Sequence, residues 1–399
     1  MRWLILFGLW LAYMTFGAIV SSLAPLVPII RADLGISNSQ MGSILGAWQV
    51  IYIFSAIPAG ILLDRIGGRW ALLIGLSFLA ISACGRALSD NYLMFLFSVM
   101  AFGLGGPIIS SGAPKIVTGL FQGSQRGLAM GIYMTGPILG GIICLTMTHS
   151  VLLPALGNDW RNLMFLWGGV AAIVAIIWIT ISSLDHSNLS ALNREASTSK
   201  NGRPKNLQVI GNIISNRSVK VLLVMAVGAF LINHGLNNWL PELLRNNSWS
   251  LAEASYWAAL PMAIGILSSL IIPRLATPER RFKILTGLCI SACLASLTLM
   301  IPGNEYLIAS LIMQGFVRAS LMTVLILTLM ELPSIKSNES GTASGLFFSA
   351  AEVGGVLGPL GLGILYDVTG GFSAGLYTLA AIAAAMAIGA MNLSKVTNK

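Results

Sequence analysis

The chain has 399 residues, of which 56% are hydrophobic and only 9% are charged. Ordinary soluble domains carry about a quarter charged residues, so this composition excludes a soluble globular protein and indicates a membrane protein. The net charge of +9 does not indicate a nucleic-acid partner, because the basic residues follow the membrane topology described below.

A membrane-spanning helix needs about 20 apolar residues, and the sequence contains twelve such stretches. The alternating pattern of a transmembrane β-strand is absent, so the predicted spans are helices. The first stretch is too long for a signal peptide and lacks a cleavage site, so it is interpreted as the first span. The predicted spans are 3–30, 40–62, 69–88, 92–119, 126–150, 160–182, 219–244, 251–274, 281–302, 304–333, 340–366 and 371–392.

The hydrophobic part of the chain repeats itself. The stretch Gly341-Thr-Ala-Ser-Gly345 begins 214 residues (341 minus 127) after the similar stretch Gly127-Leu-Ala-Met-Gly131, and Gly354-Gly355 follows Gly140-Gly141 at the same offset. Duplicated hydrophobic halves are typical of secondary transporters. The sequence therefore predicts an N-terminal six-helix half at 1–182 and a C-terminal six-helix half at 219–399. Residues 183–218 are polar and charged, and are predicted to form a linker between the halves.

Charge predicts the orientation in the membrane. Most of the 23 Lys and Arg residues fall on the same side of the twelve-span topology as both chain ends and the 183–218 linker. By the positive-inside rule that side is cytoplasmic. The short loops and the compact chain indicate the inner membrane of a bacterium. Arg318 lies within a span, and four basic residues fall on the other side: Arg31, Arg86, Arg161 and Arg245.

The loop after span 40–62 reads Gly60-Ile-Leu-Leu-Asp64-Arg65-Ile-Gly67-Gly68-Arg69. It resembles the G-x-x-x-D-R-x-G-x-R signature of the major facilitator superfamily. Together with the twelve spans and the two halves, this resemblance covers the whole chain. It implies an all-α membrane protein with twelve transmembrane helices in two pseudo-symmetric six-helix halves around a central cavity. It also implies transport driven by a proton or another gradient.

The same resemblance implies a gate on the cytoplasmic side. Gly60 is expected to let its helix approach a neighbour closely. Asp64 is expected to dock at the start of span 340–366, because a helix N-terminus attracts negative charge. Arg65 and Arg69 would complete the charge cluster. The alternative is a solvated basic loop that only fixes the topology.

Span 126–150 contains Gly136-Pro137-Ile-Leu-Gly140-Gly141, which resembles an element of drug–proton antiporters. The second half carries its own Gly354-Gly355-Val-Leu-Gly358-Pro359, so we interpret both elements as sites of close packing or bending. Many family members carry an Arg before the glycine-rich stretch that here begins at Gly103. That position is Val99, so proton coupling is not assigned to it.

Ionisable residues inside apolar spans are costly and are expected to face a cavity or a partner. Arg318 and Glu352 fall near the middle of neighbouring spans, so we expect them at the same depth and paired in the empty carrier. We predict that Arg318 binds a substrate anion and that Glu352 carries a proton. The other predicted substrate-binding residues are polar groups in spans, namely His234, Asn237, Gln49, Tyr52 and Tyr133.

Each of these residues also has a structural interpretation. Arg318 and Glu352 can form a buried ion pair that locks two helices, and His234 can bond a neighbouring helix. The tyrosines and Gln49 can pack with a satisfied polar end. Lys115 is left out of the site, because a long side chain near the end of a span can reach the membrane surface.

Motifs of other functional classes are missing from the sequence. It has no G-x-x-x-x-G-K-[ST] loop, which argues against an ATP-driven pump, and no H-E-x-x-H or G-x-S-x-G in a span, which argues against an enzyme. No repeated filter of a channel is evident. The four cysteines, all in predicted spans, indicate packing, so no metal, disulfide or cofactor is predicted. They are Cys84, Cys144, Cys289 and Cys293.

The sequence therefore predicts a secondary transporter that acts as a monomer by proton-coupled alternating access. The central cation favours a small organic or inorganic anion, such as a carboxylate or a cyanate-like ion. The stretch Trp239-Leu-Pro241-Glu-Leu-Leu244 resembles the cyanate and nitroimidazole transporters. The alternative is a drug–proton antiporter of the multidrug efflux type, supported by span 126–150. The predicted partners are the small-molecule substrate, protons and the lipid bilayer, without nucleic acid.

Overall fold

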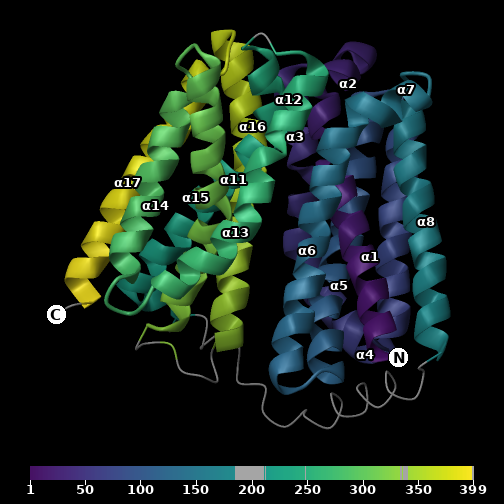
Figure 1. Cartoon of the computed structure of the whole chain (residues 1–399), viewed down its shortest axis with the longest axis horizontal. Coiled ribbons are helices and arrows are strands. Elements are labelled where there is room, and N and C mark those ends of the chain that lie inside the picture. The colour runs from purple at the N-terminus through teal and green to yellow at the C-terminus, as the bar shows by residue number, and fades with distance from the viewer. Residues whose placement is uncertain (185–210, 212, 248, 333–334, 336–339, 398–399) are drawn as a thin grey trace. The chain divides into compact units, whose positions relative to one another are not determined.

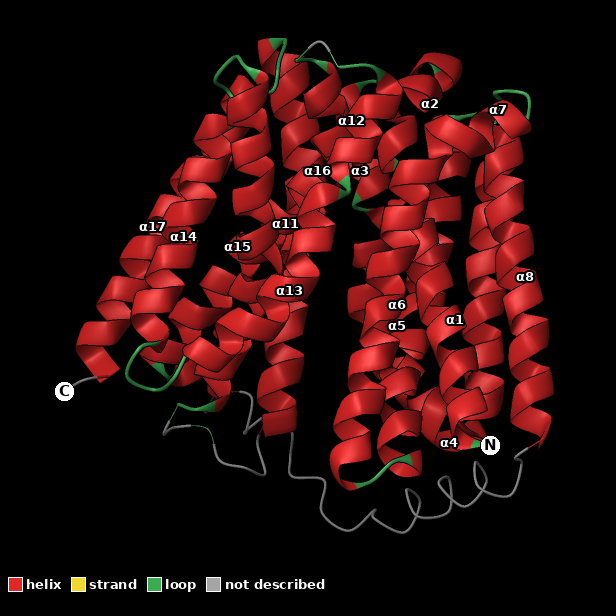
Figure 2. Ribbon diagram, viewed as in Figure 1, coloured by secondary structure: helices red, strands yellow, loops and turns green. Residues whose placement is uncertain are grey.

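The structure is a computed structural model that describes residues 1–184, 211, 213–247, 249–332, 335 and 340–397 (Figure 1). Within these residues all regular structure is helical and no strand is present (Figure 2). Most of the predicted 183–218 linker lies outside the described residues. The chain divides into two compact units. Their boundaries do not follow a single cut in the middle of the sequence, because a short N-terminal segment belongs to the second unit. The first unit is Met1–Ile36 with Ala47–Gly202, and the second is Ser37–Gly46 with Arg203–Lys399.

The described part of the first unit contains five long helices and several short helical segments. Its first predicted span is interrupted, because Pro25 and Pro28 lack the backbone N–H that a continuous helix would need. The helices of this unit are α1 (Arg2–Ser21), α2 (Val27–Leu34), α4 (Ala47–Ala87), α5 (Tyr92–Leu120), α6 (Gly123–Met147), α7 (Leu153–Ala155) and α8 (Trp160–Leu184), with a 3-10 helix at Ala24–Leu26 and a π-helix at Thr148–Leu152.

The second unit is built in the same way from long apolar helices, with one short helix taken from the N-terminal part of the chain. That helix is α3 (Asn38–Leu45), which packs against α16. The others are α11 (Arg217–Arg245), α12 (Leu251–Ala258), α13 (Leu260–Leu275), α14 (Arg281–Thr298), α15 (Asn304–Met330), α16 (Ser340–Thr369) and α17 (Ser373–Thr397).

Eleven described helical segments are long and apolar enough to cross a membrane. The longest, Asn38–Ala87, has 50 residues, about twice what one crossing requires. It contains a break at Gly67, whose φ of 79° and ψ of 164° are not helical. Such a positive φ is tolerated by glycine, which explains a glycine at this place in the loop. The break separates two spans, so the prediction of an all-helical protein with twelve spans is confirmed.

The glycines of the repeated elements allow close helix contact in both units. A side chain at Gly140 on α6 would collide with the carbonyl oxygen of Met14 on α1. In the second unit, a side chain at Gly354 on α16 would collide with the carbonyl oxygen of Val227 on α11. Small residues let helix backbones approach in this way. The two glycine elements therefore serve the same packing role. This supports the interpretation of the element at 136–141, which resembles one of drug–proton antiporters, as a site of close packing.

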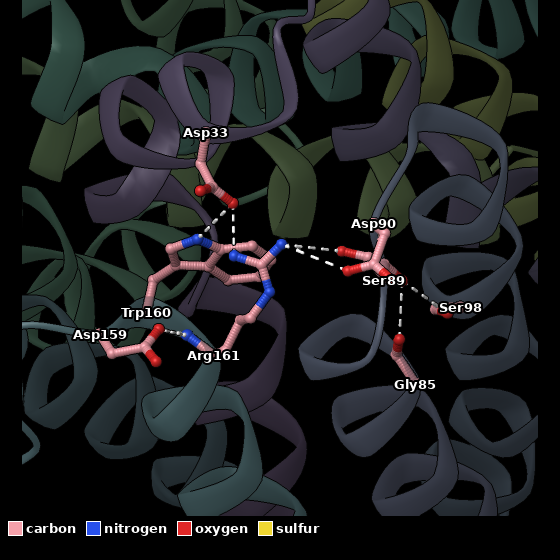
Figure 3. A network of polar contacts seen from close by, with 8 residues as sticks. All are labelled: Asp33, Gly85, Ser89, Asp90, Ser98, Asp159, Trp160 and Arg161. Atoms are coloured by element: carbon pink, nitrogen blue, oxygen red, sulfur yellow. Dashed lines mark hydrogen bonds and ion pairs between the residues drawn. The ribbon is translucent and has the colours of Figure 1, made fainter.

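A polar network joins three segments at one end of the first unit (Figure 3). Arg161, at the start of α8, forms an ion pair with Asp33 on α2 and donates to the carbonyl oxygen of Ser89 at 3.2 Å. Its guanidinium lies 4.5 Å from the ring centroid of Trp160, whose Nε1 donates to Asp33 at 3.2 Å. Asp90 adds a second carboxylate at 3.7 Å. The network holds the end of α2, the loop after α4 and the start of α8 together.

Arg86 was expected on the surface opposite the termini, but the structure buries it. Its side chain is 1% exposed, and its Nη1 donates to the carbonyl oxygen of Ile19 at 3.1 Å. The guanidinium also lies 5.7 Å from the ring centroid of Phe102. Arg86 therefore joins α1, α4 and α5 inside the first unit.

Candidate functional site

Arg318 lies at the centre of a polar cluster in the second unit. Its Nε donates to Oδ1 of Asn233, on α11, at 2.9 Å. Its Nη1 is buried and has no hydrogen-bond partner among the described residues. A buried donor without a partner is unfavourable and is rarely left so. One side of the guanidinium is thus fixed by the protein, while a second donor is available for an acceptor.

The predicted neighbours of Arg318 on α11 join the same cluster. Asn237 lies one turn after Asn233 and donates to the same Oδ1 at 3.4 Å. His234 interacts electrostatically with Arg318, and its ring lies 5.2 Å from that of Phe230, centroid to centroid. The structure therefore brings together three of the predicted site residues: Arg318, His234 and Asn237.

Glu352 lies on α16 and is 7% exposed. The expected ion pair with Arg318 is not formed: no nitrogen–oxygen distance of 4.0 Å or less joins the two charged groups in the described part of the second unit. Arg318 is turned to Asn233 instead, and Oε2 of Glu352 is buried without a hydrogen-bond partner among described residues. The expected depth on neighbouring helices did not fix the pairing, because a neutral amide on α11 accepts from Nε of the guanidinium.

The predicted residues of the first unit lie in an aromatic cluster. Tyr133, on α6, is 3% exposed and packs against Tyr13 with 5.5 Å between ring centroids. The hydroxyl of Tyr52, on α4, lies 2.8 Å from Oγ of Ser110, and its ring lies 5.8 Å from that of Trp48. Gln49 is 0% exposed. Tyr52 is half-buried, whereas Gln49 and Tyr133 are packed inside the unit.

The signature loop contains an ion pair that the sequence did not indicate. The Nζ of Lys115, on α5, lies 2.7 Å from Oδ1 of Asp64. Arg65 is exposed, and the guanidinium of Arg69 lies 5.2 Å from the ring centroid of Trp70. The close approach expected at Gly60 is not made, because an added side chain there would meet no described atom within 4 Å. The close approach is made at Gly68 instead, where an added Cβ would lie 2.6 Å from Cδ1 of Ile116.

Sequence reasoning missed the contributions of Asn233 and Lys115. Asn233 precedes His234 and shares a helix face with Asn237, because the two asparagines are four residues apart. This spacing from two predicted site residues could have identified Asn233. Lys115 interrupts an otherwise apolar span, and Asp64 is the acidic residue of the signature loop. The side chain of Lys115, which was expected to reach the membrane surface, instead reaches the carboxylate of Asp64.

No group of three or more His, Cys, Asp and Glu side chains that could hold a metal ion occurs in residues for which placement is described. Cys144 and Cys289 are buried, and Cys84 and Cys293 are half-buried. The polar atoms of the site are therefore those of Arg, Asn, His and Glu side chains. Side chains of these types can bind small polar molecules by hydrogen bonds and charge.

Comparison with known proteins places this arrangement in a family. The model of the Major Facilitator Superfamily matches residues 9–359. A quinolone resistance transporter of Acinetobacter baumannii is 24% identical over 379 residues, which cover 88% of this chain and 84% of that protein. The hexuronate transporter of Bacillus subtilis (strain 168) is 23% identical over 379 residues, covering 90% of this chain and 86% of that protein.

The fold agrees with a solved transporter structure. The crystal structure of the nucleoside transporter NupG has a TM-score of 0.81 and 14% sequence identity, covering 98% of this chain and 99% of that one. Together with the helical spans, the family match along most of the sequence leads to one conclusion. This chain belongs to the Major Facilitator Superfamily and is a secondary membrane transporter of a small molecule, not an enzyme.

Proposed function

We propose that this protein transports a small organic anion together with a proton by alternating access. Arg318 binds the anion, with His234 and Asn237 beside it, and Glu352 carries the proton. Gln49, Tyr52 and Tyr133 contribute the substrate-facing surface of the N-terminal half. In this proposal the halves are 1–182 and 219–399, the linker is 183–218, and both termini are cytoplasmic in a bacterial inner membrane. The carrier works as a monomer.

One observation carries the proposal. Arg318 lies in an apolar span, is held at Nε by Asn233 and keeps a buried Nη1 that lacks a partner among the described residues. A guanidinium presents parallel donors that match a carboxylate in two hydrogen bonds. Because no carboxylate of the described residues forms an ion pair with Arg318, a substrate carboxylate can provide the missing acceptors. The name of the hexuronate transporter supports a sugar acid as the first candidate class.

Uptake of labelled glucuronate into proteoliposomes tests this function. We expect saturable uptake that is stimulated by an inwardly directed proton gradient, together with counterflow of labelled against unlabelled glucuronate. Glucose, which lacks the carboxylate, should not compete, and liposomes without protein give the background. Linear, non-saturable uptake without counterflow, or equal competition by glucose, would count against an anion carrier.

A drug–proton antiporter is the second candidate. The aromatic cluster of the first unit favours it, because Phe16, Trp48 and Phe102 place rings 5.0 to 6.3 Å apart, and flat drugs stack on such rings. The quinolone resistance relative supports the same class. Norfloxacin expelled from proteoliposomes against its gradient, with glucuronate left untransported, would establish this function in place of the first.

We also propose that Asp64 belongs to a gate, formed with Gly60, Arg65 and Arg69. Both side chains of the Asp64–Lys115 ion pair are accessible to solvent, that of Lys115 at 30% and that of Asp64 at 60%. Loss of the pair should therefore change the free energy of unfolding by no more than about 1 kcal/mol. Asp64→Asn should therefore leave thermal stability nearly unchanged while lowering the transport rate several-fold. Binding affinity should stay close to that of the parent.

The matched control for this gate is Lys115→Met, which removes the same ion pair from the other side. If Asp64 acts by docking at the N-terminus of α16, only Asp64→Asn should slow transport. Equal slowing by both variants would assign the effect to the ion pair, and normal transport by both would leave a loop that only sets topology.

A further inference from the structure

The short helix α3 has an unusual position in the chain. Its residues Ser37–Gly46 are grouped with the second unit, although the residues on both sides, Met1–Ile36 and Ala47–Gly202, belong to the first. The helix is therefore anchored in one unit and connected covalently to the other at both of its ends. Any change in the relation of the halves during transport must act on this segment.

A carboxylate from α16 holds the start of α3. Oδ1 of Asp367 accepts from the backbone N of Asn38 at 3.1 Å and from its Nδ2 at 2.8 Å. Oδ2 accepts from the backbone N of Ser39 at 2.6 Å and from its hydroxyl at 2.5 Å. All four bonds reach across more than 300 residues of sequence.

These bonds complete a cap that α3 cannot complete itself. The first N–H groups of a helix have no partner within it. Ser37 and Gln40 form a capping box, in which the Ser37 hydroxyl accepts from the backbone N of Gln40 at 3.1 Å and Oε1 of Gln40 accepts from the backbone N of Ser37 at 3.0 Å. The backbone N–H groups of Asn38 and Ser39, which lie between Ser37 and Gln40 in sequence, donate to the carboxylate of Asp367. Negative charge is also favoured at this helix end.

Below this cap the two helices approach along glycines. A Cβ at Gly42 of α3 would lie 2.5 Å from the carbonyl oxygen of Pro359, and one at Gly46 would lie 2.9 Å from that of Val356. On α16, a side chain at Gly363 would collide with the carbonyl oxygen of Asn38. The contact is thus a close-packed surface with one charged group at its outer end.

The second copy of the repeat lacks this charged contact. There the helix α12 begins with its own capping box, in which Ser250 and Glu253 serve each other. The residue 214 positions before Asp367 (367 minus 214) is Leu153, which has no acceptor to offer. The carboxylate is therefore a feature of one copy, not a requirement of the repeated fold.

We propose that Asp367 is a latch for the side of the carrier that lies opposite the chain termini. The latch is made when that side is closed and broken when it opens. It is reversible because Asp367 is exposed, so water can replace its bonds to α3 when the helices separate. Hydrogen bonds to a charged group of this kind shift an equilibrium by about tenfold or more. The latch rests on the proposed alternating access, but it predicts a conformational change that is measurable without a transported solute.

Spin labels at Ala32→Cys, on α2 shortly before α3, and at Val368→Cys, next to Asp367, both exposed positions, test the latch in proteoliposomes. The four native cysteines are replaced by alanine in this background. Asp367→Asn and Asp367→Ala should increase the population with the longer label distance by about tenfold. Glu253→Gln is the matched control, because this carboxylate caps only its own helix, and it should leave the distances as in the parent.

Gly363→Ala gives a second route to the same result, since its methyl group separates the helices without touching the carboxylate. It should also increase the population with the longer distance, and it keeps the test decisive if an Asp367 variant does not fold. Unchanged distances in folded Asp367→Ala, or an equal shift in Glu253→Gln, would overturn the latch. Because no solute is added, a failure of glucuronate uptake leaves this outcome unaffected.

Discussion

Replacing Arg318 by alanine is expected to weaken binding of the transported anion by at least about 30-fold, since truncating one partner of a buried charge pair costs roughly 2–5 kcal/mol. The variant removes the only group in the Asn233–His234–Asn237 cluster that carries a permanent positive charge. Binding is measured by the half-saturation concentration for counterflow of glucuronate, with the amount of folded protein determined in parallel. Arg274→Ala is the matched control, because it removes a positive charge from the exposed end of α13 in the same unit.

Two further variants separate the charge of Arg318 from its orientation. Arg318→Lys keeps a cation but loses the planar fork that holds a carboxylate by two bonds, so we expect intermediate binding. Asn233→Ala removes the 2.9 Å bond to Nε while leaving the guanidinium intact, and it should also raise the half-saturation concentration. If Arg318→Ala lowers only the yield, while the folded remainder binds like the parent, the residue has a structural role.

Composition and periodicity were sufficient to predict the fold. Long apolar stretches have few structural solutions in a bilayer, because every backbone polar group must be bonded within the segment. Of the glycines in the 214-residue repeat, Gly140 and Gly354 permit close packing in their respective units, whereas an added side chain at Gly127, Gly131 or Gly345 would meet no described atom within 4 Å. These features depend on local composition and on spacing along one helix, which a sequence displays directly.

The detailed contacts of the site were less predictable. The sequence indicated that Arg318 must have a partner and suggested Glu352, whereas the structure gives it Asn233. Depth along a helix does not determine which way each helix is rotated, and the rotation decides the partner. The same reason explains Gly60, whose expected close contact is made by Gly68 instead. The start of α3 is bonded by Asp367, which is 328 residues from Ser39 in sequence.

The separation of Arg318 from Glu352 changes the expected order of events. If the two groups had paired, a substrate anion would have had to displace the carboxylate. With Arg318 bonded to Asn233, the anion has only to meet a guanidinium that is already oriented. Under the proposed function, Glu352 would then act as a separate proton site on α16. In the proposed mechanism anion and proton still cross together, because each would neutralise a charge that is costly to leave alone in an apolar span.

Glu352→Gln should uncouple uptake from the proton gradient. Glutamine has nearly the shape of the protonated carboxyl but cannot release a proton, so the carrier should exchange anions without driving them uphill. With one proton per anion, a gradient of one pH unit supports about tenfold accumulation. In proteoliposomes the variant should reach a concentration ratio of about 1 while keeping counterflow at a rate similar to that of the parent.

The control for this variant is Glu305→Gln, which neutralises an exposed carboxylate in the first turn of α15 and should accumulate glucuronate like the parent. The buried position of Glu352, with one oxygen lacking a partner in the described structure, is the reason to expect the difference. An exposed carboxylate exchanges protons with water on one side of the membrane only, whereas a buried one can carry its proton through the change of access. Undiminished uphill accumulation by Glu352→Gln would assign the proton to another group, and loss of both accumulation and counterflow would make Glu352 a part of anion binding.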